Sequence, residues 1–93
     1  MSTIVLETFL IDHLSARAPG SADPVEMARA FQAATQPDNP DREAWHRHLS
    51  AVRRTALKLA DEGRVEVLRK GKPVAATQAR GVIRLRLAVG DGA

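Results

Sequence analysis

Basic side chains gather in the second half of this sequence at spacings that suit contact with an anionic ligand. A helix whose apolar stripe starts at Trp45 and faces inward would place Arg47, Arg54 and Lys58 on its outer face. Further along, residues 69–81 hold four cations and no acidic residue. Arginine and lysine side chains on an open surface commonly contact phosphate oxygens. The candidate phosphate-binding residues are Arg47, Arg53, Arg54, Lys58, Arg69, Lys70, Lys72 and Arg80.

A solvated helix with its own ion pairs is the alternative explanation for the helical cations. Glu43 precedes Arg47 by four residues, and Lys58 precedes Glu62 by four. Such pairs stabilise a helix by about 0.2–0.5 kcal/mol each. Arg54 has no acidic residue at that spacing, so it is the cation on this helix that structure alone explains least.

Residues 69–81, "RKGKPVAATQARG", also contain glycine and proline and lie between two alternating runs. This pattern predicts a flexible loop that joins two strands. Gly71 and Gly81 would let its backbone turn or approach a partner closely, as in a loop that grips a sugar-phosphate backbone. The alternative is that charges at a hairpin tip only protect the sheet from aggregation.

No catalytic or metal-binding pattern accompanies these cations. The sequence has no cysteine, which excludes disulfides, thiolate catalysis and cysteine metal sites. His46 and His48 are two residues apart on the predicted helix and so face different directions. Neither Ser21 nor Ser50 has a recognisable histidine and acid partner. We therefore expect a protein that is not an enzyme and that uses no cofactor and no metal.

Helical periodicity and end signals predict three helices. Leucines recur every four residues from Leu6 to Leu14. Asp23 is a strong N-cap for the second helix, Asp41 is the expected cap of the third, and Gly63 suits the C-terminal end of the third. The predicted helices cover about residues 3–17, 23–34 and 42–62.

Two alternating runs, about residues 64–69 and 82–89, predict half-buried strands, and residues 90–93 are expected to fray. The simplest topology is an antiparallel hairpin whose connecting loop is the basic segment. Glu66 would pair with either Arg84 or Arg86 and leave the other arginine as a charge that protects the sheet edge. Three helices followed by a C-terminal β-hairpin wing define a winged helix, a mainly helical α+β fold in a single domain over residues 1–93.

Length and composition fit a small soluble globular domain. The chain has 93 residues, of which 44% are hydrophobic and 27% charged. No apolar run approaches a membrane span and no signal peptide is recognisable, so we expect a cytoplasmic protein without a membrane partner. Residues 1–41 carry two basic and six acidic side chains, whereas residues 42–93 carry twelve basic and five acidic ones. This asymmetry suggests an anionic partner for the second half, and the alternative is that the charges are simply solvated.

The run "WHRHLSAVRRTALKLADEGRVEVLRKGKPV" followed by "RGVIRLRL" resembles the pattern of a small bacterial domain family of unknown function. The resemblance covers about residues 23–87. Its most specific positions are Trp45, Val52-Arg53, Glu62-Gly63-Arg64, Lys70-Gly71, Pro73-Val74, Arg80-Gly81 and the run from Ile83 to Arg86. The resemblance implies a winged-helix fold and no particular activity.

Two functions remain open at this point. Most winged-helix domains bind nucleic acid, so duplex DNA is the first expected partner. However, the connection over residues 34–41 is about twice the usual three or four residues, which argues against insertion of the third helix into a major groove. The alternative is a protein-interaction or dimerisation module, in which Leu57 on the outer side of the third helix and the acidic first half meet a partner. Trp45 is expected in the core.

Overall fold

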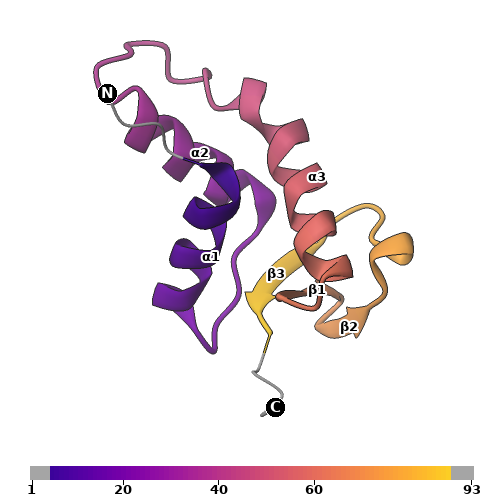
Figure 1. Cartoon of the computed structure of the whole chain (residues 1–93). Helices are drawn as coiled ribbons and strands as arrows, with labels where there is room; N and C mark the ends of the chain where they lie inside the picture. Colours follow the sequence, from indigo (N-terminus) through magenta and orange to yellow (C-terminus); the bar gives the residue numbers. More distant parts are fainter. Residues whose placement is uncertain (1–4, 89–93) are drawn as a thin grey trace.

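A computed structural model describes residues 5–88 and shows three helices followed by an antiparallel sheet (Figure 1). This is a mainly helical α+β fold in the layout of a winged helix, as the sequence predicts. The predicted start of the first helix at residue 3, the end of the last strand at 89 and the frayed tail lie outside the described residues. The elements are α1 (Leu6–Arg17), α2 (Pro24–Thr35), α3 (His46–Asp61), β1 (Val65–Arg69), β2 (Lys72–Val74), the 3₁₀ turn η1 (Ala76–Gln78) and β3 (Arg84–Leu87).

The sheet has three strands in the order β2-β1-β3, so the predicted two-strand hairpin is incomplete. The antiparallel pairing of β1 with β3 is confirmed, with Val67 opposite Leu85. The extra strand arises because Lys70 and Gly71 have φ angles of 55° and 80°. Two consecutive positive φ angles make the tight hairpin turn that suits strand twist, so β1 folds directly back into β2. The basic segment is therefore partly ordered strand rather than one flexible loop.

A single-residue bridge ties the helices to the sheet. Ala22, between α1 and α2, pairs antiparallel with Leu85 of β3. The two backbone N–H groups each donate to the other residue's carbonyl at 2.8 Å. This contact anchors the start of α2 beside β3, and it has no pattern of its own in the sequence.

The predicted N-cap of α2 and the predicted C-terminal cap of α3 are confirmed, whereas Asp41 is not the N-cap of α3, which is Trp45. Asp23 Oδ1 accepts the backbone N–H of Glu26 at 2.8 Å, and Pro24 occupies the first turn. Gly63 has φ +77°. Its N–H donates to the Ala60 carbonyl and the next N–H, of Arg64, donates to the Leu59 carbonyl, which is the Schellman arrangement.

The third helix begins later than predicted, at His46 instead of residue 42. Residues 42–45 form a tighter turn with bonds between residues three apart, such as Ala44 N–H to the Asp41 carbonyl at 3.2 Å. Asp41 still caps this turn, because its Oδ1 accepts the Glu43 N–H at 2.9 Å. The connection between α2 and α3 consequently spans residues 36–45 and arches over one end of the molecule (Figure 1).

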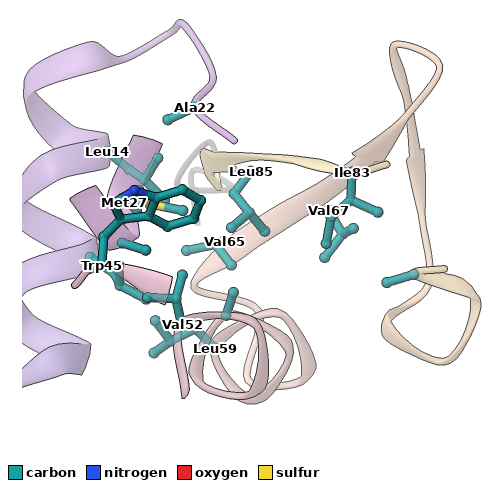
Figure 2. Close-up of a cluster of buried hydrophobic side chains, with 14 residues drawn as sticks. Leu14, Ala22, Met27, Trp45, Val52, Leu59, Val65, Val67, Ile83 and Leu85 are labelled. Carbon is teal, nitrogen blue, oxygen red and sulfur yellow. The ribbon is translucent and has the colours of Figure 1, made fainter. Parts of the chain in front are cut away.

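The hydrophobic core lies between the helices and one face of the sheet. Trp45 is only 8% exposed, as predicted. Figure 2 shows its ring beside Met27, with Leu85 of the sheet nearby. Leu57 is half-buried and packs against this core, so the expectation that it faces outward is wrong. Within residues 5–88, no helix is both long and apolar enough to cross a membrane.

Candidate nucleic-acid interface

The outer face of α3 exposes two of the predicted cations. Arg47 and Arg54 are exposed, and within residues 5–88 neither takes part in an ion pair. The predicted Glu43–Arg47 pair does not form. Glu43 lies 2.9 Å from the Nε2 atom of His46 instead, because the turn before α3 brings residues three apart together. Both guanidinium groups therefore remain open to an external anion.

Lys58 forms an ion pair within the protein, although its side chain is exposed. Its Nζ lies 2.6 Å from Oε2 of Glu7 on α1, so the predicted Lys58–Glu62 pair is wrong. The hydrogen bond and charge of Lys58 lower the pKa of Glu7, and Glu7 in turn raises the pKa of Lys58. Arg64 lies 3.6 Å from the same carboxylate and 4.0 Å from Glu62. Two carboxylates therefore face the two cations on this flank of α3, which makes it a poor phosphate site.

Arg53 lies on the opposite flank of α3 and reaches toward the wing, which we define as residues 70–83. One N–H of Arg53 donates to the Gly81 carbonyl at 3.4 Å. A groove of about 280 Å³ runs here, between the start of α2, the side of α3 and residues 81–83. Arg53 therefore joins the basic helix to the wing.

The hairpin turn between β1 and β2, where the wing begins, presents the second group of cations. Arg69, Lys70 and Lys72 are all exposed around the tight turn between β1 and β2. Arg69 and Lys70 line a second groove of about 430 Å³, which Val82 also lines. Val82 also lines the groove at Arg53. The two grooves therefore meet at Val82, with Arg53 of α3 in one and the hairpin turn in the other.

The structure brings some of the predicted site residues together and leaves others apart. Arg53, Arg69 and Lys70 flank Val82, and Lys72 faces Arg69 across the hairpin. Arg80 is exposed next to Gly81, and Arg47 and Arg54 are exposed on the outer face of α3. Only Lys58 is drawn away, toward α1. We call the remaining seven the basic surface: Arg47, Arg53, Arg54, Arg69, Lys70, Lys72 and Arg80.

The two outward arginines of β3 are both paired, which corrects the expectation that one would remain free. Arg86 contacts Glu66, as expected. Arg84 instead reaches the connection between α1 and α2, where it donates to the Ser21 hydroxyl at 2.7 Å and the Ser21 carbonyl at 2.9 Å. The charge of Arg84 also lies 3.8 Å from Asp23. Arg84 thus holds the segment next to the Ala22 bridge. No local sequence pattern predicts this contact.

Acidic residues also lie on α3, in the turn before it and on the sheet. Glu66 is paired with Arg86. Glu43 lies against His46, and Asp61 is exposed at the last residue of α3. The groove at the hairpin turn has no acidic lining residue, and the groove at Arg53 has one, Asp23. In the part of the chain that the structure describes, no three metal-ligating side chains come together to hold an ion.

The fold is that of a small α+β domain with a winged-helix layout, and exposed cations lie on its third helix, its hairpin turn and its wing. The sequence profile of DUF3253, a family described as proteins of unknown function, matches residues 4–88, and the chain belongs to that family. The predicted resemblance to an uncharacterised domain family is thereby confirmed. No curated protein matches the chain.

Proposed function

We propose that this protein is a non-enzymatic DNA-binding domain that holds duplex DNA through its basic surface. The contact between Arg53 and the Gly81 carbonyl carries the proposal, because it brings the basic side of α3 against the wing. Phosphate contacts from two elements at once fix a duplex in one orientation better than a single cationic helix does.

The aromatic residues favour a duplex over single strands. Proteins that bind single-stranded nucleic acid usually stack bases on aromatic side chains. The chain has one tryptophan, two phenylalanines and no tyrosine. Trp45 is buried, and Phe9 and Phe31 pack edge to face with ring centroids 5.3 Å apart. None of the three lines either groove of the basic surface, so bases have no stacking platform there.

The long connection before α3 favours contact with phosphates over reading of base edges. A standard helix-turn-helix joins its helices by three or four residues, whereas residues 36–45 separate α2 from α3 here. We expect the domain to lie against the backbone of the duplex with little sequence preference. Affinity that comes from phosphate contacts depends strongly on salt.

The salt dependence of DNA binding tests this proposal. Each phosphate neutralised contributes about −0.9 to the slope of log K against log salt. With about three to five cations engaged, we expect a slope of roughly −3 to −4.5 for a short duplex, measured by fluorescence anisotropy. Arg54→Ala and Lys72→Ala should each flatten the slope by about one unit.

Lys58→Ala is the matched control, because Lys58 lies one turn from Arg54 on α3 but is paired with Glu7. We expect it to leave the slope close to that of the unaltered protein. Equal slopes for Arg54→Ala and the unaltered protein would show only generic attraction to a basic protein. An equal change in Arg54→Ala and Lys58→Ala would likewise contradict the proposed surface.

The alternative function, a protein-interaction module, now rests on a different residue. Leu57 is half-buried against the core, so it offers a partner less apolar surface than an exposed side chain does. Val82 is 88% exposed and lies between the two grooves, which makes it the apolar residue that a partner would cover. If DNA does not bind in low salt and the protein self-associates, loss of that association in Val82→Asp would favour this alternative.

A further inference from the structure

The groove at Arg53 has walls that suit an aliphatic chain. Val25 and Leu49 in its lining are half-buried, and Val82 is 88% exposed, so apolar surface remains open to solvent. Its volume of about 280 Å³ is near the lower end of small-molecule sites. The aliphatic lining residues are Pro24, Val25, Leu49, Val82 and Ile83.

Arg53 is the only cation that lines this groove among the described residues. A guanidinium has five N–H donors, and the Gly81 carbonyl takes one of them at a long distance of 3.4 Å. The residues four positions away on α3, Leu49 and Leu57, carry no charge. Donors therefore remain for a bidentate contact with a carboxylate, the geometry that arginine matches best.

Asp23, the acidic residue in the lining, is held by other groups. Its Oδ1 accepts the Glu26 backbone N–H at 2.8 Å, and its Oδ2 lies 3.8 Å from Arg84. The N-terminal dipole of α2 offsets its charge further. Among the described residues no ion pair joins Asp23 to Arg53, so the Arg53 guanidinium keeps N–H donors for an anion.

We propose that this groove binds small aliphatic monocarboxylates. The carboxylate would lie on Arg53 and the chain would cover Val25, Leu49 and Val82. A single cation favours one carboxylate over a ligand with two anionic groups, and the absence of aromatic lining residues favours an aliphatic chain. Because the proposed DNA-binding surface also uses Arg53, such a ligand would compete with DNA there, a consequence that rests on the proposed function.

Titration with hexanoate, followed by methyl and backbone NMR, tests the site directly. We expect saturable shifts at Val25, Leu49 and Val82 with a dissociation constant of about 1 mM. Hexanamide has the same chain without the charge and should bind at least about tenfold more weakly. Val82→Ser should also weaken hexanoate binding while the spectrum outside the groove stays unchanged, because this side chain is exposed.

Arg53→Gln and Arg54→Gln form a matched pair that separates a site from general attraction. Both remove one positive charge from adjacent positions of α3, but only Arg53 lines the groove. We expect Arg53→Gln to weaken hexanoate binding about tenfold and Arg54→Gln to change it by less than about twofold. Equal effects of the two substitutions, equal binding of hexanamide, or no shifts at the groove would overturn the proposal. The titration contains no DNA, so its result is independent of whether DNA binds.

Discussion

Lys58 and Arg54 lie one turn apart on α3, yet their surroundings differ. Lys58 meets Glu7 of α1 at 2.6 Å, whereas Arg54 is exposed and within residues 5–88 has no ion-pair partner. The same contrast holds for the two sides of the molecule. On the side of α1 and α2, charged and aromatic groups hold the fold together. On the side of the wing, cations are presented to solvent, so substitutions there should change binding more than stability.

Trp45→Ala should lower the stability of the fold the most, because Trp45 belongs to the part of the molecule that holds the fold together. The Trp45 side chain is 8% exposed within the core, so its removal leaves a cavity. We expect the free energy of unfolding to fall by about 3–5 kcal/mol, measured by chemical denaturation. Arg54→Ala, on the other side, should change it by no more than about 0.5 kcal/mol. Similar losses in the two variants would contradict the division between the sides.

Gly63→Val should have the next largest effect, because it strains the junction between α3 and the sheet. A Cβ at this position would meet no heavy atom within 4 Å, so the cost comes from the backbone at φ +77°. We expect a loss of about 1–3 kcal/mol in unfolding free energy. Gly63→Asn should cost clearly less, because asparagine tolerates this conformation. If valine and asparagine cost the same, backbone strain is not the cause.

Lys58→Ala should lower stability by a smaller amount than the core and backbone changes, but more than Arg54→Ala does. The effect should vanish in a Glu7→Gln background and shrink in high salt, because the pair is exposed. The lowered pKa of Glu7 makes the stabilisation fully present above the ordinary pKa of glutamate, about 4.3. It should be lost as the pH falls through the lowered pKa of Glu7, which denaturation at several pH values can measure.

The smallest effect should be the pH dependence of stability that comes from His48, which contacts α2. Burial and the charge of Arg47 lower the pKa of His48, whose Nε2 lies 2.6 Å from the Gln32 amide oxygen. The unfolded chain therefore binds the proton more readily than the folded one. The contribution of His48 to the free energy of unfolding should be fully present above the ordinary histidine pKa of about 6.5. It should decrease as the pH falls below that value. His48→Gln should remove this part of the pH dependence, and an unchanged profile would contradict it.

Signals confined to a few neighbouring residues were sufficient to predict much of the fold. Asp23 and Gly63 are recognisable as helix ends because capping depends on the side chain or the backbone freedom of a single residue. The alternation of apolar and polar residues in β1 and β3 predicted their buried faces, because successive side chains of a strand point to opposite faces of the sheet. The turn at Lys70-Gly71 was missed, because lysine is an unusual residue for the first position of such a turn.

The candidate site was predictable only as a set of residue types. The sequence by itself determined that the second half is basic, that three helices precede a sheet, and that Arg54 has no local partner. Only the tertiary structure decided which cations stay free. Lys58 is paired with a residue 51 positions away and Arg84 with one 63 positions away. Contacts over such separations depend on how α1 and the Ala22 bridge pack, and no local pattern encodes that packing.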